Sequence, residues 1–142
     1  MYTIDQINSI RHRARALKLG TPWEFHALAA AALTKICNGY GPDKWSDAGR
    51  KVLTVIYRKY PCSAAIHDVR YHYSDGTQAG RQIADDEFGA NLELEWAAVY
   101  GWSRWINPVA LYARVKIRAA YVFVKSMGAD AWAAAFGARP EA

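Results

Sequence analysis

The chain has few cysteines and no long apolar segment. Its 142 residues include only Cys37 and Cys62, which allow at most one disulfide bridge and exclude a disulfide-dense secreted scaffold. The alanine-rich stretch His26–Ile36 is too short to span a bilayer. Asp5 and the arginines that follow it interrupt any apolar run that could serve as a signal peptide. We therefore expect synthesis in the cytoplasm without a signal peptide and, if the chain acts outside the cell, release by another route.

Charge and composition narrow the range of partners. The residues are 52% apolar and the formal net charge is +5, which favours a globular domain with anionic partners such as nucleic acid, phosphate groups or an anionic membrane surface. The arginines of Arg11–Lys18 are two residues apart and spread around a helix, and no nucleic-acid-reading motif is present. The charge does not choose among these partners, but without such a motif we expect no nucleic-acid binding. Most of the tryptophans are expected in the core, but Trp102 and Trp105, beside Arg104, are residue types that also favour a lipid interface.

Helix start and stop signals predict one all-α domain over residues 1–142, without a linker or repeat. Thr3 caps a first helix that ends at Gly20, and Thr21-Pro-Trp-Glu begins a second helix that continues to Ile36. Further helices are expected over Cys62–Tyr73, Thr77–Tyr100, Pro108–Ser126, which Gly128 ends, and Ala129–Phe136. The stretch Lys51–Tyr60 fits a short strand or a buried helix.

A glycine-rich loop follows the second predicted helix. In Cys37–Asp43 (CNGYGPD), Gly39 and Gly41 let successive backbone carbonyls turn toward one point. Hard cations such as calcium are held by oxygen ligands of this kind. Taken alone, a loop with this composition is more typical of a simple turn.

Three polar side chains lie close together on the helix predicted for Cys62–Tyr73. His67 and Tyr71 are four residues apart and share a face of the helix. Asp68 is displaced by about 100° around the helix axis from His67. Its carboxylate can therefore bind a cation beside the imidazole without competing for the same proton.

A tight turn at Ser74–Gly76 connects this helix to the next one. Helices joined by a short connection pack antiparallel, so residues at equal distances from the turn face each other. His67 and Asp85 are at nearly equal distances, whereas Asp86 points off this face and is expected to be a solvated charge. A carboxylate on the far nitrogen of an imidazole fixes its tautomer and stabilises its charged form. Together with an oxygen-lined cation site, this arrangement suits the attack of water on an ester.

The order of a glycine loop, His-Asp-x-x-Tyr and Ala-Asp-x-x-Phe resembles the phospholipase A2 superfamily, in particular its small bacterial, phage and parvovirus-type members. The segments that carry the resemblance are Cys37–Pro42, Ala64–Tyr71 and Ala84–Phe88. The motif-bearing core covers about residues 37–100, and the helices over 3–36 and 108–136 flank it.

This resemblance implies calcium-dependent hydrolysis of the sn-2 ester of glycerophospholipids. Together with the basic charge, it implies a peripheral contact with an anionic phospholipid membrane surface, and its phage-type members suggest association with phage. It makes His67 the general base, Asp68 a calcium ligand, Asp85 the partner of His67, and Tyr71 a hydrogen-bonding support for Asp85. Carbonyl ligands that alternate up to Gly41 are those of Cys37, Gly39 and Gly41. If they alternate from Gly39, the third is that of Asp43, and both registers stay open.

The sequence departs from the family at its usual disulfide bridge. Members carry a cysteine inside the loop, bonded to one three residues before the histidine, and here these positions hold Tyr40 and Ala64. Because both are replaced, the change fits loss of a whole bridge, for which Cys37 and Cys62 offer a substitute. The interval Gly41–His67 is also longer than in compact animal enzymes. The alternative to an enzyme is a catalytically silent scaffold of the same kind that binds a protein or an anionic membrane.

Overall fold

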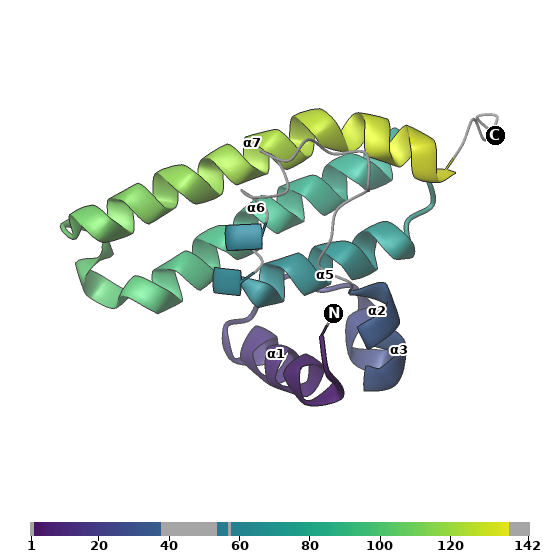
Figure 1. Cartoon of the computed structure of the whole chain (residues 1–142), viewed down its shortest axis with the longest axis horizontal. Helices are drawn as coiled ribbons and strands as arrows, with labels where there is room; N and C mark the ends of the chain where they lie inside the picture. The colour runs from purple at the N-terminus through teal and green to yellow at the C-terminus, as the bar shows by residue number, and fades with distance from the viewer. Residues whose placement is uncertain (1, 38–53, 57, 137–142) are drawn as a thin grey trace.

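The computed structural model describes residues 2–37, 54–56 and 58–136 (Figure 1). Its helices are α1 (Ile4–Ala16), α2 (Trp23–Ala27), α3 (Ala30–Ile36), α5 (Pro61–His72), α6 (Gln78–Tyr100), the 3-10 helix η1 (Gly101–Trp105) and α7 (Pro108–Phe136). Residues 54–56 are helical as well, so this part of Lys51–Tyr60, for which a strand or a helix was expected, is a helix. No strand occurs in these ranges, and the predicted all-α class is confirmed.

The long helices are stacked in a layer, with α6 between α5 and α7 (Figure 1). The N-terminal helices α1, α2 and α3 pack against α5 and form a second layer. One apolar core lies between the N-terminal helices and α5, and another lies between α6 and α7. The first core joins Ile7, Phe25 and Leu33 to α5, and the second joins Leu92 and other residues of α6 to α7. Helix α5 therefore lies between the N-terminal layer and α6.

The first helix begins where the sequence predicts but ends earlier. The Thr3 hydroxyl accepts a hydrogen bond from the backbone N–H of Gln6, and the Gln6 side-chain oxygen accepts one from the backbone N–H of Thr3. The helix ends at Ala16 and not near Gly20, because Lys18 takes a left-handed conformation with a φ of 53°. A non-glycine residue in this region is unusual.

The prediction of one helix from Thr21 to Ile36 is wrong, because the chain is extended at Leu28 and Ala29, between α2 and α3. The predicted capping by Thr21 is also absent, since Pro22 occupies the capping position without a side-chain bond. The Arg11 guanidinium donates hydrogen bonds to the carbonyls of Phe25, at 2.8 Å, and Leu28. A cation from α1 thus satisfies carbonyls that a continuous helix would have bonded internally.

The last helix is longer than predicted. Helix α7 runs without interruption through Gly128, which was expected to end it. A Cβ atom at Gly128 would lie only 2.9 Å from the Tyr71 hydroxyl oxygen. The glycine therefore permits close approach of α7 to α5 and does not end the helix. None of the helices in the described ranges has the combination of length and hydropathy that crossing a bilayer requires.

A buried carboxylate joins α6 to the beginning of α5. Glu95 is completely buried, and one of its oxygens accepts hydrogen bonds from the Ser63 backbone N–H at 2.8 Å and the Ser63 hydroxyl at 2.6 Å. The other oxygen lies 3.4 Å from the Cys62 backbone nitrogen and 3.9 Å from Nε of Arg13. The first N–H groups of a helix have no partner within the helix and carry partial positive charge. Glu95 therefore caps α5 from a neighbouring helix.

The two cysteines are free thiols in the first core. Cys37 Sγ donates toward the Ala65 carbonyl oxygen at 3.5 Å, and Cys62 Sγ donates toward the Ile10 carbonyl oxygen at 3.7 Å. The substitute bridge between them is not formed. Both thiols instead lie where the N-terminal layer meets α5.

Candidate active site

The turn between α5 and α6 sets the register of the two helices. Gly76 has a φ of 80°, a conformation that glycine adopts without strain. The Asp75 carboxylate accepts from the Thr77 backbone N–H at 2.9 Å, and the Thr77 hydroxyl caps α6 by accepting from the Gly80 N–H at 3.0 Å. These local bonds begin α6 directly after the turn, so α5 and α6 lie antiparallel.

This register brings His67 and Asp85 together, as the hairpin argument predicts. His67 Nε2 lies 3.3 Å from Asp85 Oδ1. The Asp85 side chain is buried, whereas the His67 side chain retains 8% exposure. Nδ1 of the imidazole makes no hydrogen bond to another described residue. The ring therefore contacts the carboxylate through one nitrogen only.

Tyr71 binds the same carboxylate oxygen. Its hydroxyl donates to Asp85 Oδ1 at 2.8 Å. Burial of Tyr71, followed by its hydrogen bond to Asp85 and the negative charge of that residue, raises the pKa of the phenol far above its usual value. The phenol is therefore a neutral, permanent donor, and it fixes Asp85 Oδ1 in place beside the imidazole.

Arg81 is a neighbour of this carboxylate that the sequence analysis missed. Its Nη1 lies 3.7 Å from Asp85 Oδ2, close enough for electrostatic attraction but too far for a hydrogen bond. The same nitrogen donates to the Lys125 carbonyl of α7 at 3.2 Å. Asp85 Oδ2 has no hydrogen-bond partner among the described residues. The spacing of four residues between Arg81 and Asp85 was the available signal for this contact.

Aromatic rings enclose the polar group. The Phe88 ring centroid is 4.7 Å from that of His67, and the Trp132 ring meets the Tyr71 ring edge-on at 4.8 Å. Trp132 Nε1 also donates to the Gly76 carbonyl at 3.0 Å and so joins the end of α7 to the α5–α6 turn. No local pattern links Trp132 to a motif that lies far before it in the chain, so sequence reasoning did not find it.

The residues that the sequence predicts to bind calcium are described only in part. Gly39, Gly41 and the alternative ligand Asp43 lie outside the described residues. Cys37 is described, and burial, followed by the negative charge of Asp68, raises the pKa of its thiol. Asp68 is half-buried, and its charge acts on the Cys37 thiol. The described residues contain no cluster of three acidic, histidine or cysteine side chains.

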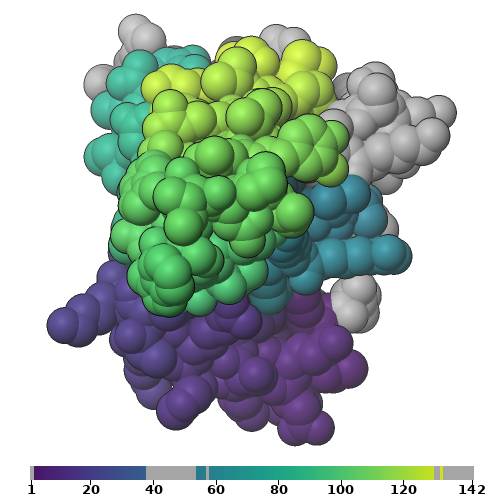
Figure 2. Space-filling view, turned by 90° about the vertical axis from the view of Figure 1, so that its left-hand side faces the viewer, coloured from purple at the N-terminus to yellow at the C-terminus, as the bar shows by residue number. Residues whose placement is uncertain are grey.

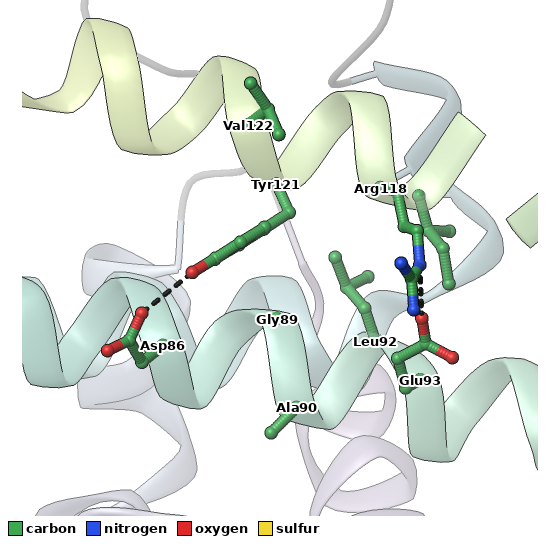
Figure 3. A pocket seen from close by; sticks show the side chains of 9 residues that line it. Asp86, Gly89, Ala90, Leu92, Glu93, Arg118, Tyr121 and Val122 are labelled. Carbon is green, nitrogen blue, oxygen red and sulfur yellow. Dashed lines mark hydrogen bonds and ion pairs between the residues drawn. The ribbon is translucent and has the colours of Figure 1, made fainter. Parts of the chain in front are cut away.

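A separate groove lies between α6 and α7 (Figure 3). At one end the Tyr121 hydroxyl donates to the Asp86 carboxylate at 2.7 Å, and at the other Arg118 pairs with Glu93 at 3.2 Å. Between them, a Cβ atom at Gly89 would come within 2.9 Å of the Tyr121 ring. Asp86 is exposed and points away from His67, as its position next to Asp85 on the helix predicts.

No family model, curated protein or solved structure matches the chain.

Proposed function

We propose that the protein is a calcium-dependent, phospholipase A2-like hydrolase that cleaves the sn-2 acyl ester of glycerophospholipids. The observation that carries the proposal is the contact of His67 Nε2 with a buried Asp85 oxygen that also accepts from Tyr71. A polar group of this composition is costly to bury. General-base chemistry can use it, because a carboxylate on one imidazole nitrogen fixes the tautomer and stabilises the charged form of the ring.

In this mechanism, Nδ1 of His67 takes a proton from a water molecule as the water oxygen attacks the ester carbonyl carbon. Asp85 keeps the proton of the neutral imidazole on Nε2 and stabilises the positive charge that forms on the ring. His67 then returns a proton to the departing alcohol oxygen, and the products are a fatty acid and a lysophospholipid. Tyr71 holds the Asp85 oxygen in the orientation that this transfer needs.

Asp68, with carbonyls of the glycine loop, would hold the calcium ion. A bound calcium ion supplies positive charge that polarises the ester carbonyl. The support for this assignment is that the negative charge of Asp68 acts on Cys37, the first residue of the predicted loop, and raises the pKa of its thiol. Calorimetric titration with calcium should show clearly weaker binding by Asp68→Asn, because only dipoles and water would remain as ligands. Identical affinity in the two proteins would exclude Asp68 as a ligand.

Fatty-acid release from mixed phospholipid vesicles, with calcium and then with a chelator, tests the activity directly. We expect release that depends on calcium and that His67→Asn abolishes. The low exposure of the His67 side chain, 8%, favours the alternative of a catalytically silent scaffold. Calcium binding without any release of fatty acid would support that alternative.

A further inference from the structure

The turn between α6 and α7 exposes large apolar side chains. Trp102 is 84% exposed and Ile106 74% exposed. Figure 2 looks onto this end of the molecule, where the green part of the chain is nearest the viewer, above the purple N-terminal helix. We call residues 99–112 the hairpin tip. Its exposed apolar side chains are Val99, Trp102, Trp105, Ile106, Val109, Leu111 and Tyr112.

Positive charge accompanies these side chains. Between Glu95 and Asp130 the chain has five basic residues and no acidic one. The Arg104 guanidinium lies 5.4 Å from the Trp105 ring centroid, and Lys116 Nζ lies 4.4 Å from that of Tyr112. Neither cation forms an ion pair with a carboxylate in the described part of the chain. Aromatic rings with adjacent cations suit the boundary between lipid headgroups and acyl chains.

The shape of the tip distinguishes between possible occupants. The tip is the narrow end of a helical hairpin that projects beyond the N-terminal helices (Figure 1). A stable protein–protein interface buries about 800 Å² per partner, and a projecting end with few side chains offers less than a broad face. A bilayer surrounds a projecting end on all sides. We infer that the hairpin tip docks the protein on anionic phospholipid membranes.

The tip is remote from His67. The part of α6 between Asp85 and Tyr100 corresponds to roughly 22 Å of helix, so side chains of the tip can change without altering the site. This inference deepens the proposed function, because it names the surface that meets the lipid. It does not need turnover, since vesicle binding can be measured with an inactive protein.

Co-sedimentation with vesicles tests the inference. We expect the wild-type chain to bind vesicles of equal parts phosphatidylcholine and phosphatidylglycerol more tightly than pure phosphatidylcholine. The double variant Trp102→Ser/Ile106→Ser should weaken binding at least about tenfold, because two apolar side chains no longer enter the bilayer. Arg104→Gln and Lys116→Gln should each weaken binding to the anionic vesicles about fivefold and leave binding to neutral vesicles unchanged.

Trp23→Ser is the matched control. Trp23 is 75% exposed, as a tip tryptophan is, but lies at the beginning of α2. The control should bind anionic vesicles like wild type. Trp105 is left intact in the double variant, because its ring packs edge-on against the buried Trp96 ring at 5.3 Å and supports the tip. Circular dichroism should show the same helix content in all variants.

The outcomes separate this inference from the proposed function. His67→Asn should bind vesicles like wild type, and the tip double variant should still hydrolyse a monomeric short-chain phospholipid. Vesicle binding without any fatty-acid release would reject the proposed function and leave the inference standing. Wild-type vesicle binding by the double variant, or an equal loss in Trp23→Ser, would overturn the inference. A wild-type dimer that the double variant dissociates would also overturn it, in favour of self-association through the tip.

Discussion

Two buried acids on α6, Asp85 and Glu95, both contact α5 but meet different kinds of partner. Glu95 accepts hydrogen bonds from backbone N–H groups and a hydroxyl at the beginning of the helix, and both of its oxygens have contacts. Asp85 meets the side chains of His67 and Tyr71 on one oxygen, and its other oxygen has no hydrogen bond among the described residues. The first acid holds two helices together, whereas the second is linked to a side chain that exchanges protons.

This difference teaches that burial alone does not identify a functional acid. A carboxylate at a helix N-terminus is stabilised by groups that do not titrate. A carboxylate beside an imidazole changes its interaction energy whenever the imidazole gains a proton. If the comparison is correct, substitutions near Asp85 should affect turnover, and substitutions of Glu95 should affect stability.

The largest expected effect is that of His67→Asn on turnover. Loss of the general base should reduce fatty-acid release about 1000-fold, while thermal unfolding and calcium binding stay close to wild type. If His67→Asn hydrolysed vesicles at the wild-type rate, the activity would belong to another site, and Asp85 would no longer differ from Glu95 by a catalytic role.

Replacement of Glu95 should give the largest loss of stability. Glu95→Ala leaves buried N–H groups and the Ser63 hydroxyl without an acceptor, so urea denaturation should show a loss of about 3 kcal/mol. Glu95→Gln keeps one acceptor oxygen and should lose less. Vesicle hydrolysis by the folded fraction should stay near the wild-type rate. If a Glu95 variant kept wild-type stability but lost activity, Glu95 would be the acid that serves turnover, contrary to our comparison.

Asp85→Asn should mainly affect the rate. The amide keeps the size of the side chain but removes the charge that stabilises the protonated ring, and a 10- to 100-fold decrease in turnover is expected. Asp86→Asn is the matched control, because Asp86 is the adjacent acid on the exposed face and contacts Tyr121 and Lys125. We expect no measurable change in rate for that control. Equal losses in both variants would indicate a general effect of charge.

The smallest expected changes in rate come from substitutions that disturb the hydrogen bond from Tyr71 to Asp85. Tyr71→Phe removes one hydrogen bond, and the rate should fall about fivefold. Gly128→Ala should act in the same direction, because the new methyl group would displace the Tyr71 hydroxyl from Asp85. Gly89→Ala introduces an equally close contact with the Tyr121 ring, away from His67, and should leave the rate unchanged. If Gly89→Ala slowed turnover as much as Gly128→Ala, the effect would be one of stability.

Local signals predicted most of the fold and the centre of the site. Thr3 and Thr77 cap helices where the sequence indicates, and the short turn before Thr77 fixed the pairing of His67 with Asp85. Such signals depend on residues a few positions apart. The break between α2 and α3 and the continuation of α7 through Gly128 were missed because their causes are distant in sequence. Arg11 and Tyr71 supply those causes.

The positions of the two thiols make them reporters of motion between the layers. Burial raises the pKa of both the Cys37 and the Cys62 thiol, so little thiolate is present near neutral pH. A thiol reagent can therefore react only after the N-terminal helices separate from α5. The labelling rate, followed by mass spectrometry, would measure how often this layer opens while α6 and α7 stay packed. Glu95→Ala should accelerate labelling of Cys62, whose backbone it uncaps, more than that of Cys37.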